Sequence, residues 1–300
     1  MTRRPIIQRG IIGKFYKPRK KATFVGQFIR LTPEHKNIYN HYIKNNFYEN
    51  LYLNLDFNKD FKYNPYDKKN GHFYGYFEKD ILLGVFVFSN NGILHLSYID
   101  DSVLKKLDLL RAIKKYKPKI IKGKKESIEK VVEVFEKSIT NYKANNYYIM
   151  EYSGGKQFTM QRSCHVTPQL LNKSFDFLVN VERSFGRNPK LLNDIKTKLI
   201  EKYANNEYFA FEEEGRIISQ GMLENNGENF IVIGSIYTKE NYRKQGYGKK
   251  IVQLLINEVV SRKKTPLLLV KKENIGAINL YNKLGFKKKA DFQILELEII

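Results

Sequence analysis

The segment 243–248, Arg-Lys-Gln-Gly-Tyr-Gly, constrains the fold of this chain more than any other. An apolar run at 230–236 precedes it, and apolar residues at helical spacing follow from Lys249. The pattern predicts a strand, a glycine turn and a helix with one buried face. The first N–H groups of such a helix lack partners within it and, together with the helix dipole, favour an anion. Gly246 and Gly248 allow the backbone to approach a phosphate. The surrounding positive charges are Arg243, Lys244, Lys249 and Lys250.

Two other kinds of phosphate loop do not fit this segment. A dinucleotide loop requires Gly-x-Gly-x-x-Gly and a later acidic residue, and the glycine spacing here is different. A nucleoside triphosphate loop ends in Gly-Lys-Ser/Thr, whereas Gly248-Lys249-Lys250 lacks the hydroxyl residue and the upstream glycine. The sequence therefore predicts a diphosphate cradle of another class.

Two motifs in the last third of the chain resemble one known family. The turn at 243–248 resembles the acyl-CoA signature Arg/Gln-x-x-Gly-x-Gly/Ala of the GNAT superfamily of N-acetyltransferases. Further on, Asn274, Ala277 and Tyr281 precede Leu-Gly-Phe, which is similar to the second GNAT signature. Between the motifs, 266–270 predicts a buried strand, and 291–300 predicts a last strand. Ala277 and Tyr281 are four residues apart and share a helix face.

The resemblance implies direct transfer of an acyl group from acetyl-CoA to a primary amine in a ternary complex. It assigns the pantetheine arm to backbone groups of Ser235, Ile236, Tyr237 and Thr238. It assigns the pyrophosphate to the amides of Gln245, Gly246, Tyr247, Gly248 and Lys249. It also implies that Asn274 contacts the cofactor arm and that Tyr281 protonates the departing thiolate as a general acid.

The general base is where the chain departs from some members of the superfamily. N-acetyltransferases of ribosomal proteins have a Glu on the strand that corresponds to 266–270, and this chain has Leu269 there. Glu224 and Glu228 are the remaining candidates, each acting through a water molecule.

A long internal repeat suggests how the chain is divided. Residues 73–92 and 208–227 align without a gap at an offset of 135, and each reads as an aromatic strand, a charged turn, an apolar strand and an Asn-Gly turn. A third strand follows each copy, at 93–99 and 230–236. A helix precedes each copy, starting at Thr32-Pro33 and at Asn188-Pro189. The repeat predicts a duplicated domain.

The offset of 135 places residues 108–113 opposite the glycine turn, and this segment has Asp108 and no glycine. The N-terminal copy is therefore expected to bind no cofactor. The chain looks similar to bacterial tandem proteins with a degenerate N-terminal GNAT-like domain. We predict an α/β (α+β) fold of two GNAT-like domains, each a mixed, mostly antiparallel sheet flanked by helices. The predicted parts are a basic arm at 1–21, the degenerate domain at 22–150 and the catalytic domain at 151–300.

Composition limits the other functions. The formal net charge is +22, but the lysines are spread over the whole chain, so the sequence predicts no nucleic-acid partner except through the arm at 1–21. The single cysteine, Cys164, and five dispersed histidines predict no metal site. No apolar run is long enough to span a membrane and no signal peptide is present, which predicts a cytoplasmic protein without a membrane partner.

Two alternatives to a catalytic acetyltransferase with a small-molecule or peptide amine acceptor stay open at this stage. One is a regulatory module that binds acyl-CoA without transferring the acyl group. The other is an acetyltransferase that associates with ribosomes or nucleic acid through the basic arm.

Overall fold

The computed structural model describes residues 26–55, 60–67, 70–105, 107–136, 139, 141–155, 157–159, 171–184 and 192–297. The basic arm, Cys164, His165 and Asn188-Pro189 lie outside the described residues. Within the described part, no helix is long and apolar enough to cross a membrane.

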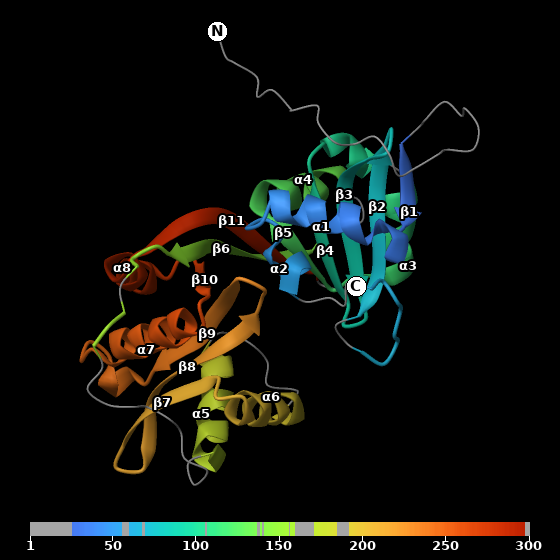
Figure 1. The fold of residues 1–300 in the computed structure, drawn as a ribbon. Coiled ribbons are helices and arrows are strands. Elements are labelled where there is room, and N and C mark those ends of the chain that lie inside the picture. Colours follow the sequence, from blue (N-terminus) through green and yellow to red (C-terminus); the bar gives the residue numbers. More distant parts are fainter. Residues whose placement is uncertain are drawn as a thin grey trace.

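One sheet of eleven strands runs through the molecule (Figure 1). Its order is β1-β2-β3-β4-β5-β11-β6-β10-β9-β8-β7. Neighbouring described strands are antiparallel except for β4 with β5 and β9 with β10. The fold is thus a mixed α/β fold with a mostly antiparallel sheet flanked by helices, as predicted.

The N-terminal half begins the sheet and carries helices on both of its faces. Its strands are β1 (Gln27–Arg30), β2 (Gly71–Glu78), β3 (Ile81–Ser89), β4 (Ile93–Tyr98) and β5 (Ile120–Lys124). Its helices are α1 (Lys36–Asn45), α2 (Leu51–Leu55), α3 (Leu107–Tyr116) and α4 (Lys125–Val134). The cluster under α3 and α4 includes Phe86, Leu96 and Ile121, whereas α1 packs on the other face, against Val85 and Val87.

The C-terminal half repeats much of this pattern. Its strands are β7 (Tyr208–Glu213), β8 (Arg216–Asn226), β9 (Phe230–Thr238) and β10 (Thr265–Lys271). Its helices are α5 (Leu171–Ser184), α6 (Leu192–Ala204), α7 (Tyr247–Ser261) and α8 (Ile275–Leu284). The helices α7 and α8 cover one face, over Ile231, Ile233 and Leu268, and α5 and α6 cover β7 and β8 on the other.

Two long strands join the halves at the centre of the sheet. β6 (Tyr142–Tyr152) follows α4 in the sequence but pairs with β10, and β11 (Phe286–Leu297) follows α8 but pairs with β5. β6 and β11 also pair with each other, from Phe286 opposite Tyr152 to Leu297 opposite Tyr142. Each half therefore completes its sheet with the strand that follows the other half. The expected boundary at 150/151 falls inside β6.

The N-terminal half also covers part of the C-terminal half. Phe47, Leu51 and Tyr52, at the end of α1 and in α2, pack on the face of the central strands that carries Ile149 and Phe292. The ring of Phe47 meets Phe230 edge-on, with centroids 4.9 Å apart. The two halves therefore share a hydrophobic core as well as a sheet.

The central strand β6 offers a test of this dependence. Ile149 is fully buried between the halves, so Ile149→Ala should lower the free energy of unfolding by about 2–5 kcal/mol. Urea unfolding followed by circular dichroism measures the change. Lys143→Ala, at an exposed position of the same strand, should change it by less than about 0.5 kcal/mol. Hydrogen exchange should show β3 and β8 losing protection together, and a loss confined to one half would contradict the shared core.

Candidate functional site

The turn between β9 and α7 has the backbone that an anion cradle needs. A short helical turn, η4 (Glu240–Tyr242), leads into it. Lys244 and Gly246 both have positive φ, of 62° and 87°, and Gly246 is the N-cap of α7. Arg243 anchors the turn, because its Nε donates to the carbonyl oxygen of Thr238 at 3.1 Å. The left-handed backbone at Gly246 explains why glycine is present at this position.

The space above the two glycines is open. A Cβ added to Gly246 would meet no atom within 4 Å, and one added to Gly248 would meet only the hydroxyl oxygen of Thr238, at 3.5 Å. The helix that starts here, α7, has fifteen residues, and its first N–H groups have no partner within the helix. Lys249 and Lys250 are exposed on its first turn. A diphosphate fits this position by space, by hydrogen-bond donors and by charge.

The sheet splits immediately beside this turn. β9 and β10 pair only from Phe230–Thr265 to Val232–Leu267. Beyond that point β9 follows β8 as far as Thr238, and β10 follows β6 as far as Lys271. The two parallel strands diverge and leave a wedge that leads toward α7, and we call it the β9–β10 wedge.

A local irregularity turns β9 away from its neighbour. The register of β8 and β9 shifts at two places, between Gln220 and Met222 and between Leu223 and Asn225. Ser235 has a left-handed backbone with a φ of 50°, which is rare for a residue with a side chain. Bulges bend a strand and re-aim its side chains. Ser235, Ile236, Tyr237 and Thr238 all lie half-buried along the side of the wedge formed by β9.

Helix α8 carries the residues of the second motif and packs over the same hydrophobic cluster as α7. The Asn274 side chain caps it by accepting a hydrogen bond from the N–H of Ala277 at 3.1 Å. Gly285 ends the helix with a φ of 101°. Asn274 thus has a structural role that the motif alone did not reveal.

Tyr281 lies in the hydrophobic cluster beneath α8. It packs edge-on against Phe286, with ring centroids 5.8 Å apart, and is 7% exposed. The cluster also holds Ile233 of β9 and Val270 of β10, one from each side of the wedge. Burial raises the pKa of the Tyr281 phenol to about 12, so it carries its proton at neutral pH.

An ionised carboxylate lies next to the irregular part of β9. Glu224 occupies the bulge in β8, and its side chain is 19% exposed. Oε1 accepts a short hydrogen bond from the Ser235 hydroxyl, and Oε2 pairs with Nζ of Lys198 on α6 at 2.8 Å. Burial by itself would raise the pKa of Glu224, but Lys198, Ser235 and Lys202 together hold it below its ordinary value of 4.5.

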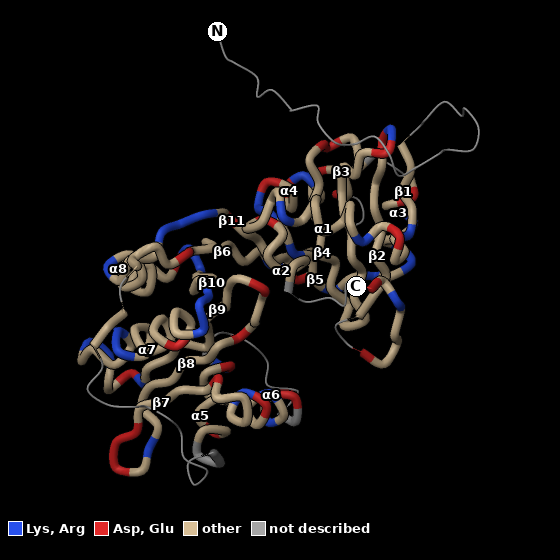
Figure 2. The backbone as a smooth tube through the Cα atoms, viewed as in Figure 1, with Lys and Arg blue, Asp and Glu red and all other residues tan. Residues whose placement is uncertain are grey.

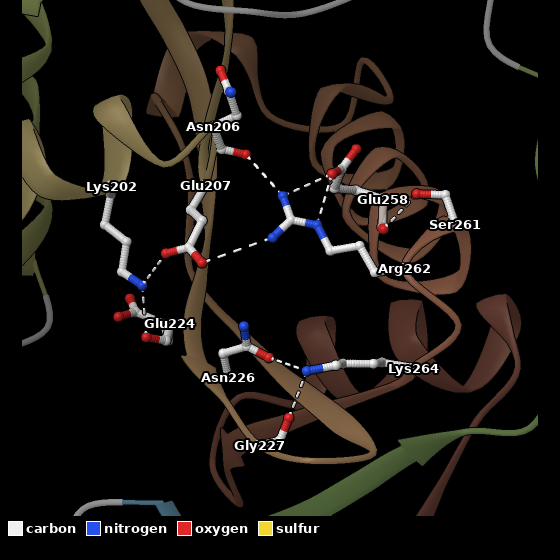
Figure 3. Close-up of polar contacts among 10 residues, drawn as sticks. All are labelled: Lys202, Asn206, Glu207, Glu224, Asn226, Gly227, Glu258, Ser261, Arg262 and Lys264. Atoms are coloured by element: carbon white, nitrogen blue, oxygen red, sulfur yellow. Dashed lines mark hydrogen bonds and ion pairs between the residues drawn. The ribbon is translucent and has the colours of Figure 1, made fainter.

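A second set of charges fixes the backbone that carries Glu224 (Figure 3). Nζ of Lys202 binds Glu207 Oε2 at 2.7 Å and the carbonyl oxygen of Glu224 at 2.8 Å. Arg262, at the end of α7, reaches Glu207 at 3.8 Å and Glu258 at 2.8 Å. These contacts tie α6, the start of β7, β8 and the C-terminal end of α7 together, and they hold the backbone of Glu224 in place.

Another hollow, of about 380 Å³, lies elsewhere on the sheet. Phe47 and Tyr48 of the N-terminal half, Phe230 and Thr265 line it, and Glu151 accepts a hydrogen bond from the Tyr48 hydroxyl at 2.6 Å. Phe230 and Thr265 are the first residues of β9 and β10, whereas the wedge opens at the other end of these strands. This hollow is therefore separate from the glycine turn.

The N-terminal half has a corresponding divergence that is filled by its own side chains. β4 and β5 pair only from Ile93 to His95. Tyr98, at the end of β4, is buried and donates from its hydroxyl to the carbonyl oxygen of Ser127 on α4 at 2.8 Å. In register Tyr98 lies opposite Gly84 as Thr238 lies opposite Ser219, so the two residues are equivalent. A tyrosine occupies the place where the C-terminal half has a threonine beside open space.

The predicted counterpart of the glycine turn in the N-terminal half was wrong in its position. The offset of 135 pointed to residues 108–113, but these lie inside α3. The segment that precedes α3, as the glycine turn precedes α7, is η2 (Asp101–Lys105). The offset fails here because β9 is longer than β4 and carries two register shifts. The described part of this segment still has no glycine, and it begins with Asp100 and Asp101.

The helices α7 and α8, which follow or carry the two sequence motifs, thus pack over one hydrophobic cluster. Of the two candidate bases named from the sequence, the structure shows Glu224 bonded to Ser235. Glu224 was only a distant candidate, because the bulge that turns it toward Ser235 has no clear sequence signal. Lys198 was not considered at all. Among the described residues, no group of three or more His, Cys, Asp or Glu side chains could hold a metal ion.

The comparisons with known proteins agree with this geometry. The profile of the acetyltransferase (GNAT) family matches residues 175–286. That range runs from α5 to the first residue of β11 and contains the wedge, the glycine turn and α8. Proteins of this family typically use acetyl-CoA, so the match suggests acyl transfer with that donor.

Solved structures extend the likeness of fold to most of the chain. A GCN5-related N-acetyltransferase from Sphaerobacter thermophilus aligns with 90% of this chain and 94% of its own, at a TM-score of 0.61 and 12% identity. A GNAT acetyltransferase from Colwellia psychrerythraea aligns with 91% of this chain and with all of its own chain, at a TM-score of 0.55 and 11% sequence identity. A third structure is a fungal multi-domain GH3 β-N-acetylglucosaminidase that contains a GCN5-related glucosamine N-acetyltransferase region. It aligns with 91% of this chain and 38% of its own chain, at a TM-score of 0.53 and 12% sequence identity. No curated protein matches this chain.

Glu224 should make the stability of the protein depend on pH. Its pKa is lower in the folded protein than in the unfolded chain, so the unfolded state binds more protons as the pH falls past 4.5. The stability contributed by Glu224 is present above that pH and is lost as the pH falls through the folded pKa. Urea unfolding between neutral and acid pH should show a smaller loss for Glu224→Gln than for the wild type. An equal loss in both proteins would contradict the assignment.

Proposed function

We propose that this chain is an acetyl-CoA-dependent N-acetyltransferase whose site lies in the C-terminal half. The observation that carries the proposal is the glycine turn at the start of α7, open to solvent and placed where β9 parts from β10. The acceptor is a primary amine on a small molecule or peptide. The family match and the fold of the aligned structures support the reaction class.

In this proposal the donor binds along the β9–β10 wedge. Its pyrophosphate lies against the amides of Gln245, Gly246, Tyr247, Gly248 and Lys249, with Arg243 and Lys244 adding positive charge. Its pantetheine arm lies along Ser235, Ile236, Tyr237 and Thr238, between the parted strands. Asn274 and Ala277, at the start of α8, border the other side. The space above the glycines and the divergence of the strands support this placement.

The two proton transfers have one candidate each. Tyr281 is protonated at neutral pH and shares a cluster with residues from both sides of the wedge, which suits a general acid for the leaving thiolate. Glu224 is ionised, buried and bound to Ser235, which suits a group that binds the acceptor ammonium and takes its proton, directly or through water.

We further propose that the N-terminal half is a degenerate copy without a donor site. The shared order of hairpin, third strand and helix supports the duplication. The buried Tyr98 and the acidic, glycine-free segment before α3 argue against a second cradle. Because β6 and β11 are exchanged, the expected parts 22–150 and 151–300 would be halves of one unit that does not fold in pieces.

The first test concerns binding. Gly246→Asp puts a side chain and a negative charge where the diphosphate would lie, so it should abolish acetyl-CoA binding in calorimetry, whereas the wild type should bind one molecule per chain. Gly92→Asp is the control, since Gly92 has a similar φ of 78° but lies in the β3–β4 turn. Wild-type affinity in Gly246→Asp, or two molecules bound per chain, would refute the placement.

The second test concerns chemistry. Tyr281→Phe should keep the ring packing and the donor affinity but slow turnover by roughly ten- to a thousandfold at saturating substrate. A panel of amines, including an amino sugar, a polyamine and a lysine peptide, supplies the acceptor, with free CoA as the readout. Tyr152→Phe is the control, because Tyr152 is also buried against Phe286. Binding without turnover on any amine would favour the regulatory module instead.

A further inference from the structure

A lysine of the chain itself pairs with the carboxylate that we propose as the binding group for the acceptor ammonium. Nζ of Lys198, on α6, lies 2.8 Å from Oε2 of Glu224. The other oxygen of the same carboxylate accepts the hydrogen bond from Ser235. A primary ammonium group is thus separated from the irregular residue of β9 by a single carboxylate.

The Lys198 amine is accessible to solvent. Its side chain is 37% exposed, and no other ion pair of Lys198 is recorded among the described residues. Its four-carbon stem is flexible, so small rotations move the nitrogen past the carboxylate without moving α6. Ser235 and Tyr237 lie on the side of β9 that faces α5 and α6, since Tyr237 packs in the cluster under these helices. Lys198 therefore approaches the wedge from the face of the sheet opposite α7 and α8.

We propose that Lys198 is an acetylation site, modified by the acyl-transfer site of its own chain. This inference rests on the proposed function, because acetyl-CoA is the co-reactant. Lys198 is held where an acceptor ammonium would bind, so it is an internal acceptor of the same chemical class as the external one.

The reaction balances with groups already described. The Lys198 ammonium gives one proton to Glu224, and the freed amine forms a C–N bond with the acetyl carbonyl carbon of acetyl-CoA. The C–S bond breaks, and the thiolate takes the proton of Tyr281. The nitrogen loses a second proton, which restores Tyr281 through solvent. The products are N-acetyl-lysine, CoA and the one proton left on Glu224, which passes to solvent.

Two other lysines of α6 serve as internal comparisons. Lys202 is buried, and its Nζ is held by Glu207 and by the backbone of Glu224, so its nitrogen has no path to the wedge. Lys196 is exposed two residues before Lys198. Non-enzymatic acetylation by the thioester follows exposure, so it modifies Lys196 before Lys198. Acetylation by the site reverses this order.

The experiment incubates the full chain with acetyl-CoA and follows each lysine by peptide mass spectrometry. Lys198 should be acetylated roughly tenfold faster than Lys196 or more, because its nitrogen is already positioned, and Lys202 should stay unmodified. The rate per chain should not change with protein concentration. Glu224→Gln should slow labelling of Lys198, and Gly246→Asp should reduce it to the level of Lys196.

The outcomes separate this inference from the function on which it rests. Acetyl-CoA binding and turnover of an external amine, with Lys198 labelled no faster than Lys196, would overturn the acetylation site alone. No binding and no turnover would overturn both. Equal labelling of Lys198 in Gly246→Asp, or a rate that rises with protein concentration, would show that the chain's own site is not responsible.

Discussion

The pairing of β6 with β11 is the interaction on which the rest of the molecule depends. Each strand borders one half of the sheet and comes from the segment that follows the other half. If β6 is removed, β10 becomes an edge strand, and if β11 is removed, β5 becomes one, and in either case the remaining central strand loses its partner. The wedge depends on the same pairing. β10 can leave β9 only because β6 holds it on its other side.

Within the C-terminal half, one partly buried carboxylate links the strand geometry to the proposed chemistry. A buried charge is costly unless it is paired and hydrogen-bonded. Glu224 has both an ion pair and a hydrogen bond, from Lys198 and Ser235, while Lys202 fixes its backbone. These partners come from α6 and β9, so the carboxylate also holds the irregular strand against the helix. An acceptor ammonium that replaced Lys198 would preserve the charge balance, which supports the proposed amine acceptor.

The charge of the whole chain says less than this local arrangement. Lys and Arg residues lie on both halves and on the central strands, including a run at Lys287, Lys288 and Lys289 (Figure 2). Several of these charges are already paired, as Lys288 is with Asp291 and Lys289 is with Glu151. Such pairs on an exposed surface contribute little to stability. The net charge therefore gives no reason to assign a nucleic-acid surface to the described part.

The sequence predicted the features that depend on neighbours along the chain. The glycine turn and the hairpins of the repeat are local, because turns require particular residues at fixed spacing. The cap at Asn274 is local too, but the sequence analysis assigned this residue only to the cofactor arm. It did not predict the exchange of β6 and β11, since partners in a sheet are chosen by packing between distant segments. The environment of Glu224 was missed for the same reason: Lys198 and Ser235 are far from it in sequence, and the bulge that brings them together follows no residue pattern.

The same physics explains why a shared fold need not give two sites. Both halves contain parallel strands that diverge after three pairs, and a split of this kind must be filled by side chains or by a ligand. In the N-terminal half the large side chain of Tyr98 lies at the end of β4, and its hydroxyl donates a hydrogen bond to a carbonyl oxygen of α4. In the C-terminal half the equivalent residue is the smaller Thr238, and a Cβ on the neighbouring Gly248 would meet only its hydroxyl oxygen, at 3.5 Å. A single large side chain at the end of β4 is thus the difference that supports the proposal of one donor site, in the half that keeps a small residue at this position.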